Sequence, residues 1–234
     1  MAVLLLRLAG PMQSWGTQSR FTHRDTDLEP SKSGVIGLLC SAMGKPRDDL
    51  ISIKEIARLK MGIRVDQQGT LKRDFHTAQN VAKAGGDGTK DCELSNRFYL
   101  SDACFLVALM GEIGLLEKLQ KSLENPVWQT YLGRKAFVPG LPVYLPDGLL
   151  PNCADLLIAL KNYCYLLPQR KRGLPELLRV EIETEFGQGG RVKQDQPISF
   201  ISADRQFGLR YMKSDRVERA NLPLAKEEQC IFLA

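Results

Sequence analysis

The chain has 234 residues, of which 44% are hydrophobic and 25% are charged, and its formal net charge at pH 7 is +5. This length supports one large domain or two small ones, and the composition is ordinary for a soluble globular protein. The charge is too small for a histone-like chain, but it permits a nucleic-acid partner. Six scattered cysteines form no Cys-x-x-Cys pair, which disfavours structural zinc and favours a reduced, cytoplasmic protein.

The chain begins with a predicted strand, which is followed by a predicted helix. Residues 2–9 are a run of mostly Val and Leu that ends before Gly-Pro, as is typical of a buried strand. This run is interrupted by Arg7 and is too short for a signal peptide or a membrane span. A helix is predicted over residues 33–43, although Gly34 and Gly37 each disfavour it by roughly 1 kcal/mol relative to alanine. Close approach of another backbone would explain these glycines.

Two further strands and a second helix follow in the order of a ferredoxin-like sandwich. Residues 60–69 and 99–111 are predicted strands, and the apolar run in the second is typical of a central position. Residues 112–126 place leucines at helical spacing and end at Asn-Pro. This order fits an RRM-type α+β fold. The polar segment 71–98 is too long for an ordinary loop, so we expect an arm that projects from the body.

After residue 126 the chain changes to a long loop rich in glycine and proline, over residues 127–148. The remaining predicted elements are a helix and three strands, over residues 155–167, 177–186, 197–203 and 207–212. We therefore expect residues 1–153 to form the ferredoxin-like domain, with the arm inserted at about 71–98. Residues 154–234 are expected to form a smaller C-terminal α/β part.

The beginning of the first helix, "SKSG", is a candidate anion site. It combines the positive end of a helix dipole and free backbone N–H groups with Lys32, Ser33 and Gly34. Gln13 and Trp15 precede it, and an indole can stack on a base with roughly 1–3 kcal/mol of binding free energy. An ordinary N-cap and a tryptophan that covers a loop are the simpler interpretations of each feature taken alone.

Two other segments place basic residues beside aromatic ones. The loop "YLGRKAF" holds Arg134 and Lys135, and the segment "ADRQFGLRYMKSDR" holds Arg205 and Arg210. Such segments suit a single strand of nucleic acid, whereas a solvated loop is the simpler interpretation of either alone. The densest basic run, over residues 169–173, follows a helix and is expected to be a solvated turn.

The sequence contains little that suggests catalysis. His76 is the candidate general base for metal-independent RNA cleavage, with Lys72 or Tyr99 near it. A histidine in a polar arm more often contacts RNA or has no chemical role. The sequence lacks nucleophile-elbow, zinc-protease and phosphate-loop motifs and a carboxylate cluster for magnesium, and the aromatic RNP signature of RRMs is also missing.

Six short motifs lie in a specific order between the N-terminus and about residue 213. They are LLLRLAGPMQSWG, PSKSGVIGLL, RDFHTAQ, YLSDACFLVAL, YLGRKAF and RQFGLRYM. Together they resemble the CasD family, the fifth Cas subunit of type I-E CRISPR Cascade complexes. The resemblance implies a RAMP-type ferredoxin-like domain, a protruding β-hairpin thumb and a smaller C-terminal part. It also implies a non-catalytic subunit that holds the 5′ handle of the crRNA.

The resemblance and the charged clusters together define the residues expected to contact RNA. These are Gln13, Trp15, Arg24, Lys32, Ser33, Gly34, Arg73, His76, Arg97, Arg134, Lys135, Arg205 and Arg210. The implied partners are the crRNA handle, the Cascade backbone and large subunits and, through the complex, target DNA; no metal, cofactor or membrane is expected. Two alternatives stay open: a protein-only scaffold, and an endoribonuclease that processes precursor crRNA, as a type I-C relative does, with His76 as its base.

Overall fold

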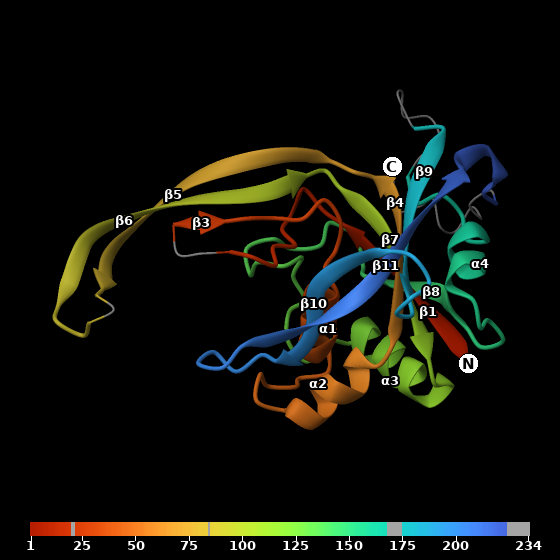
Figure 1. Ribbon diagram of the computed structural model, residues 1–234, viewed down its shortest axis with the longest axis horizontal. Coiled ribbons are helices and arrows are strands. Elements are labelled where there is room, and N and C mark those ends of the chain that lie inside the picture. The colour runs from red at the N-terminus through yellow and green to blue at the C-terminus, as the bar shows by residue number, and fades with distance from the viewer. Residues whose placement is uncertain (20–21, 84, 168–174, 224–234) are drawn as a thin grey trace.

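The computed structural model describes residues 1–19, 22–83, 85–167 and 175–223. A seven-stranded antiparallel sheet runs through the body in the order β10-β11-β9-β4-β7-β1-β8 (Figure 1). Its strands are β1 (Ala2–Ala9), β4 (Lys60–Gln67), β7 (Cys104–Gly111), β8 (Tyr144–Leu150), β9 (Leu177–Thr184), β10 (Arg191–Ser199) and β11 (Gln206–Glu218).

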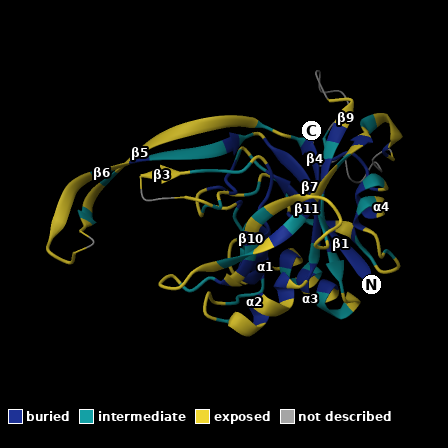
Figure 2. Cartoon of the chain, in the orientation of Figure 1, coloured by how far each residue is buried: buried dark blue, intermediate teal, exposed yellow. Residues whose placement is uncertain are grey.

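A second sheet contains a long hairpin that extends away from the body (Figure 1). The hairpin consists of β5 (Thr70–Ala82) and β6 (Thr89–Ser101), and most of its surface is exposed (Figure 2). Two short strands, β2 (Met12–Gln13) and β3 (His23–Arg24), also pair with β6. The segment 71–98, predicted to be a projecting arm, forms most of this hairpin.

Helices cover both faces of the seven-stranded sheet. The helices α1 (Lys32–Ala42), α2 (Leu50–Ala57) and α3 (Ile113–Glu124) lie on one face, and α4 (Leu156–Lys161) lies on the other (Figure 1). A short 3-10 helix spans Arg219–Asn221.

Strand β1 is covered on both faces, which explains why its sequence is apolar at every position except Arg7. Leu4 and Leu6 belong to the core beneath α1 and α3, whereas Val3 and Leu5 belong to the core beneath α4. Because successive side chains of a strand point to opposite faces, a strand covered on both faces is apolar at every position. The strand predicted over residues 2–9 is confirmed, and so are the two helices predicted within residues 33–43 and 112–126.

The strand predicted over residues 99–111 is confirmed as the central strand β7 from Cys104 onward, but its predicted start is wrong, because this segment belongs to two sheets. Strand β6 ends at Ser101 in the hairpin sheet, and β7 begins at Cys104 in the main sheet. Between them Asp102 has φ 58, in the left-handed region, which redirects the chain. The apolar content continues across this bend, so hydrophobicity alone did not locate it.

The helix α2 was not predicted from the sequence, and most of the residues that form β8 were predicted to lie in an irregular loop. Strand β10 begins at Arg191, six residues before the predicted strand over 197–203, and α4 is shorter than predicted. Because β9 hydrogen-bonds to β4, the C-terminal strands continue the main sheet. The domain boundary near residue 153 stays a prediction. Within the described ranges, no helix is both long enough and apolar enough to cross a membrane.

Candidate nucleic-acid interface

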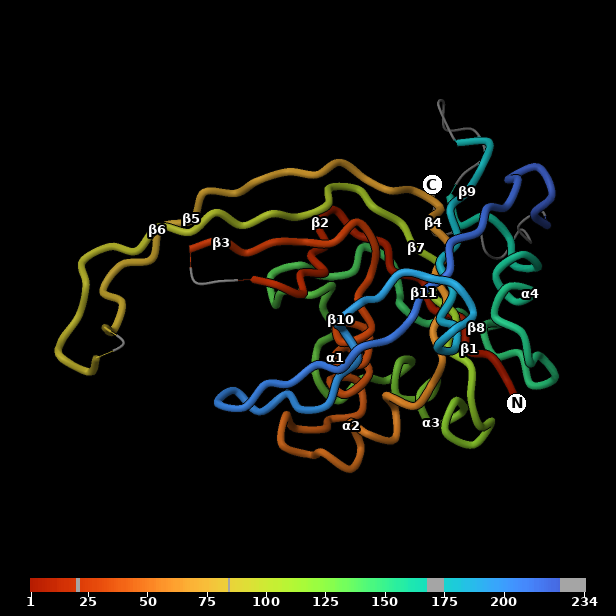
Figure 3. The backbone as a smooth tube through the Cα atoms, in the orientation of Figure 1, coloured from red at the N-terminus to blue at the C-terminus, as the bar shows by residue number. Residues whose placement is uncertain are grey.

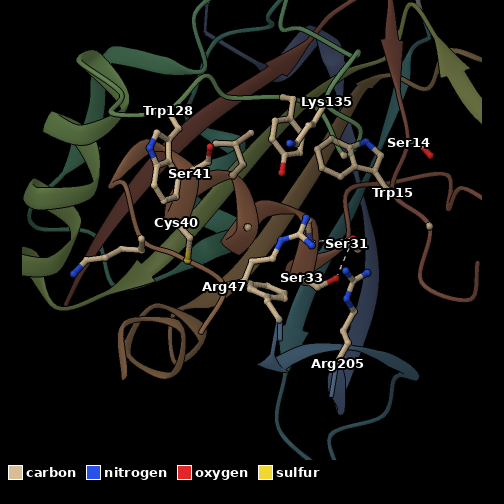
Figure 4. Close-up of a pocket in the computed structure, with 18 of the residues that line it drawn as sticks. Ser14, Trp15, Ser31, Ser33, Cys40, Ser41, Arg47, Trp128, Lys135 and Arg205 are labelled. Carbon is tan, nitrogen blue, oxygen red and sulfur yellow. Dashed lines mark hydrogen bonds between the residues drawn. The ribbon is translucent and has the colours of Figure 1, made fainter. Parts of the chain in front are cut away.

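A cleft of about 720 Å³ lies between α1, the loop that follows α3 and the loop that joins β10 to β11 (Figure 4). Trp128 and Cys40 lie on one side of this cleft, and Trp15, Ser33 and Arg205 lie on the other. Strand β10 packs against α1 and α2 (Figure 3), and this packing brings the β10–β11 loop to the cleft. The cleft is thus formed by segments that are far apart in the sequence.

The side chains around this cleft are basic, aromatic and hydroxyl-bearing. Its charged side chains are Lys45, Arg47, Lys135 and Arg205, and no Asp or Glu occurs among the described residues that line it. Its aromatic residues are Trp15, Trp128, Tyr131, Phe200 and Phe207. Basic grooves with aromatic side chains are typical of proteins that bind single-stranded nucleic acid, because phosphates pair with the cations and bases stack on the rings.

Five of the residues expected to contact RNA line this cleft: Trp15, Ser33, Gly34, Lys135 and Arg205. The lysine and the arginine are both exposed. Gly34 does not make room for a phosphate, since a Cβ atom there would lie 2.8 Å from Cε3 of Trp15. The close neighbour of this glycine is a side chain of the protein, which corrects the expected role.

Gln13 and Trp15 are buried, which corrects the expectation that they face a base. The indole of Trp15 is 1% exposed, and its Nε1–H donates to Oε1 of Gln13 at 3.1 Å. The Gln13 amide donates in turn to the carbonyl oxygens of Leu8 and Ala103, at 3.1 and 2.8 Å. The indole therefore fills the floor of the cleft and supports α1, and it is not available for stacking.

Lys32 and Arg210 are buried as well, and their partners are acidic residues of the same chain. The ammonium group of Lys32 is 3.0 Å from Glu183, and its backbone N–H donates to Asp195 at 2.8 Å. The guanidinium of Arg210 forms two hydrogen bonds to Asp195. The anion expected at the beginning of α1 is therefore the carboxylate of Asp195. Burial lowers the pKa of Lys32, and Glu183 opposes this shift.

A second ion-pair cluster holds the segment before α1 against the C-terminal strands. Glu29 is 4% exposed and accepts from Arg179, Arg191 and Lys193. Burial would raise the pKa of Glu29, but these three cations outweigh it and lower the pKa to about 2. This cluster was not predicted from the sequence, because its members are distant along the chain and none has a distinctive local pattern.

Three arginines gather where the hairpin meets the body: Arg24, Arg97 and Arg134, here called the arginine cluster. Arg24 pairs with Arg97 in the register of β3 and β6, and Arg134 donates to the carbonyl oxygens of Arg24 and Phe98, at 3.3 and 2.9 Å. Burial lowers the pKa of Arg134, and the charges of Arg97 and Arg24 lower it further. Among the described residues, none of the three forms a salt bridge, so the cluster favours an external anion.

The other two expected residues lie on strand β5 of the hairpin, on opposite faces. Arg73 pairs with Phe98 of β6, whereas His76 pairs with Ser95. Arg73 and His76 are both exposed. Because alternate residues of a strand share a face, His76 lies on the face of Arg97 and Arg73 does not. The structure thus separates Arg73 from the arginine cluster.

The loop 131–137 connects the cleft to the arginine cluster. Within it, Lys135 lines the cleft while Arg134 faces the hairpin. The loop is docked by a hydrogen bond from the Ser14 N–H to the Leu132 carbonyl, at 3.1 Å. Gly133 has φ +89, and a Cβ atom there would lie only 1.7 Å from the Ser14 carbonyl oxygen. This position requires glycine both for its backbone conformation and for the space.

Four further basic or aromatic residues of the cleft were not predicted from the sequence, namely Lys45, Arg47, Trp128 and Phe200, while Tyr131 and Phe207 belong to the two predicted basic and aromatic segments. Lys-Pro-Arg directly after the glycine that ends α1 was a local signal, and a tryptophan in a polar loop was another. The basic run over residues 169–173 lies outside the described residues. In the described part of the chain, no cluster of three or more His, Cys, Asp or Glu side chains is arranged to hold a metal ion.

A mixed α/β body with a basic, aromatic cleft is the arrangement of a protein built to bind a single nucleic-acid strand. Residues 3–213 match the family model described as "CRISPR-associated protein (Cas_Cas5)". The chain therefore belongs to the Cas5 family of CRISPR-associated proteins.

Individual relatives agree with this membership. The chain is 34% identical over 174 residues to the CRISPR system Cascade subunit CasD of Escherichia coli strain K12, which covers 68% of this chain and 76% of that protein. A solved structure described as "Crystal structure of Cas protein" is 42% identical, with a TM-score of 0.75, and covers 95% of this chain and 98% of its own. A chain of a "CRISPR RNA-guided surveillance complex" is 32% identical, with a TM-score of 0.76, and covers 98% and 97%.

Proposed function

We propose that this protein is the non-catalytic crRNA-binding subunit of a type I-E Cascade complex. In this proposal it holds the 5′ handle of the crRNA in the cytoplasm and links the backbone and large subunits during targeting of foreign DNA. The relative from Escherichia coli is a Cascade subunit, and one similar solved chain belongs to an RNA-guided surveillance complex. The observation that carries the proposal is the cleft, whose lining combines four cations and five aromatic residues with no described acid.

The cleft and the arginine cluster together define the proposed RNA path. The strand would follow the loop 131–137, with its phosphates near Arg24, Arg97 and Arg134 and then near Lys135 and Arg205. Gln13, Trp15, Lys32 and Arg210 support this surface from inside the protein. Arg73 and His76, on opposite faces of the hairpin, are proposed to contact RNA or a neighbouring subunit.

The finer description of the fold is part of the same proposal. The strand order β4-β7-β1-β8, with α1 after β1 and α3 after β7, supports a ferredoxin-like domain within residues 1–153. The hairpin of β5 and β6 would be the thumb of this RAMP-type domain. Residues 154–234 would form the smaller C-terminal part, attached through the pairing of β9 with β4.

The decisive experiment measures binding and cleavage in the same samples. Purified protein is mixed with end-labelled repeat RNA in EDTA at several salt concentrations, and each sample is also run on a denaturing gel. We expect bound but uncut RNA, with an affinity that falls as salt rises. Lys135→Ala should reduce the slope of log affinity against log salt by about 0.7, the value for one phosphate contact on a single strand.

Lys54→Ala is the matched control, because Lys54 is an exposed lysine of α2 outside the cleft lining. It should leave the salt slope unchanged. RNA that stays unbound at low salt would contradict the proposal. A discrete cut that disappears in His76→Ala would identify a processing nuclease instead. Loss of subunit assembly in Lys135→Ala with unchanged RNA affinity would identify a protein-only scaffold.

The cleft wall itself can be tested at Gly37, which lines the cleft. A Cβ atom at Gly37 would have no neighbour within 4 Å, so a larger side chain fits the fold but occupies the cleft. Gly37→Leu is expected to retain or raise the free energy of unfolding, by up to roughly 1 kcal/mol, because leucine favours the helix. The same variant should weaken RNA binding at least tenfold, or by about 1.4 kcal/mol.

Gly114→Leu is the control for this prediction. Gly114 is a helical glycine of α3, outside the cleft lining, and a Cβ atom there also has no neighbour within 4 Å. This variant should fold and bind RNA like the parent protein. Unfolding in urea and RNA titration would be measured for both variants, and equal RNA affinities would contradict a role of the cleft in binding.

A further inference from the structure

The two tryptophans of the chain differ sharply in exposure. Trp15 is 1% exposed and its indole N–H is bonded to Gln13, whereas Trp128 is 46% exposed and lines the opposite side of the cleft (Figure 4). Within the described part of the chain, the indole N–H of Trp128 has no hydrogen-bond partner. A large aromatic ring is therefore presented to the cleft without a structural partner of its own.

The backbone around Trp128 is held firmly, although the ring is half exposed. The N–H of Trp128 donates to the carbonyl oxygen of Ser41 at 3.2 Å, and the N–H of Val127 donates to Ala42 at 2.9 Å. The Ser41 hydroxyl donates to the carbonyl oxygen of Gln129 at 3.2 Å. These bonds fix the loop on the C-terminal turn of α1, so little conformational entropy is lost when a ligand contacts the ring.

The charge beside this ring indicates an anionic ligand. Val127 packs against Gly44, which brings the next residue, Lys45, to the same end of the cleft. Lys45 has a partner in Asp49, at 3.4 Å, but this pair lies at the surface, where the two side chains are 37% and 24% exposed, and such pairs are weak. A ligand at this end thus meets a flat apolar ring and an ammonium group within one site.

We propose that the indole of Trp128 is a stacking platform for one unpaired base of the bound RNA, and that Lys45 contacts a neighbouring phosphate. A ribonucleotide strand supplies a planar base and an anion in each repeating unit, which matches the ring and the lysine. This inference rests on the proposed function and extends it to a defined nucleotide position at the end of the cleft remote from Arg205.

Tryptophan fluorescence provides a direct readout, because the chain contains only two tryptophans. The full-length protein is titrated with a short single-stranded RNA from the repeat, and binding is followed in parallel by the anisotropy of labelled RNA. Base stacking should quench the emission of Trp128 in step with binding. In Trp128→Phe, where only the buried Trp15 emits, RNA should bind without comparable quenching.

Variants of Trp128 measure how much its ring contributes to RNA affinity. Trp128→Leu should weaken RNA binding about 5- to 150-fold, the range that corresponds to stacking of one base, and Trp128→Phe should retain most of the affinity. Phe186→Leu is the matched control, because Phe186 is an exposed aromatic residue, 80% accessible, that does not line the cleft. It should bind RNA like the parent protein.

A set of RNAs with a single abasic site separates stacking from a purely structural role. Removing the base that stacks on Trp128 should weaken binding to the parent protein but have little further effect on Trp128→Leu. Abasic sites elsewhere should weaken binding to both proteins equally. A structural role of the ring would instead make the effects additive at every position.

The possible failures are distinguishable. RNA that binds with the expected salt dependence, but without quenching or with unchanged affinity in Trp128→Leu, would overturn this inference and leave the proposed function intact. Quenching caused by the other subunits and not by RNA would show that Trp128 is a protein contact. If the protein binds no RNA, alone or assembled, both the proposed function and this inference are wrong.

Discussion

Replacing Asp195 with alanine is expected to lower the free energy of unfolding by about 3–5 kcal/mol, the range for breaking a buried ion pair from one side. Asp195 is fully buried and accepts from the backbone N–H of Lys32 and from the guanidinium of Arg210. Without this carboxylate, a buried guanidinium and a helix N–H lose their main acceptor. The change would be measured by urea unfolding of the parent and variant proteins.

Glu185→Ala serves as the control for this prediction. Glu185 pairs with Lys60 at the surface, where the two side chains are 63% and 41% exposed. Exposed pairs typically contribute less than about 1 kcal/mol, so this variant should unfold close to the parent midpoint. If Asp195→Ala were equally mild, the buried cluster would not be what joins α1 to β10 and β11.

Gly133→Ala is expected to disrupt the loop that connects the two parts of the proposed interface. The added methyl group would lie 1.7 Å from the Ser14 carbonyl oxygen, and alanine disfavours the observed φ of +89. Because the obstacle is backbone, the loop 131–137 must move. We expect a loss of about 3 kcal/mol in stability, from backbone strain and overpacking together, and a larger relative loss in RNA affinity than Lys135→Ala causes.

The control is Gly187→Ala, which separates the effect of an unfavourable backbone conformation from that of a steric clash. Gly187 also has a positive φ, +84, but a Cβ atom there would meet nothing within 4 Å. The free energy of unfolding of this variant should fall by only about 1–2 kcal/mol, because alanine disfavours a positive φ, and its RNA affinity should be unchanged. Equal stability and equal RNA affinity of the two variants would show that the contact with Ser14 does not position the loop.

The elements that could be predicted from the sequence are those with a strong local pattern. The apolar run of β1 and the leucines at helical spacing in α3 predicted these elements close to their observed bounds. The helix α2 spans only eight residues and was missed, although Asp49 caps it through a hydrogen bond from the Ser52 N–H. The bend at Asp102 was not predicted, because Tyr99 and Leu100 just before it and the apolar strand β7 after it resemble one continuous strand.

In the candidate site, the sequence predicted the types of residue but not which of them face the cleft. Lys135 and Arg205 were predicted from basic residues beside aromatic ones, and both line the cleft. Arg210 satisfied the same criterion, and Trp15 was expected to stack on a base, but both are buried with internal hydrogen-bond partners. Trp128 was passed over in a loop, and it is the tryptophan that the cleft exposes.

The sequence by itself determined the main strand and helix types, the long polar hairpin and the family resemblance, because each depends on neighbouring residues or on short ordered motifs. Only the tertiary structure decided which cations face solvent. Lys32 and Arg210 carry the same charges as Lys135 and Arg205, but Glu183 and Asp195 enclose the first two, and these acids lie 151 and 163 residues after Lys32. The role of a charged side chain depends on the long-range partners that either neutralise it inside the fold or leave it free for a ligand.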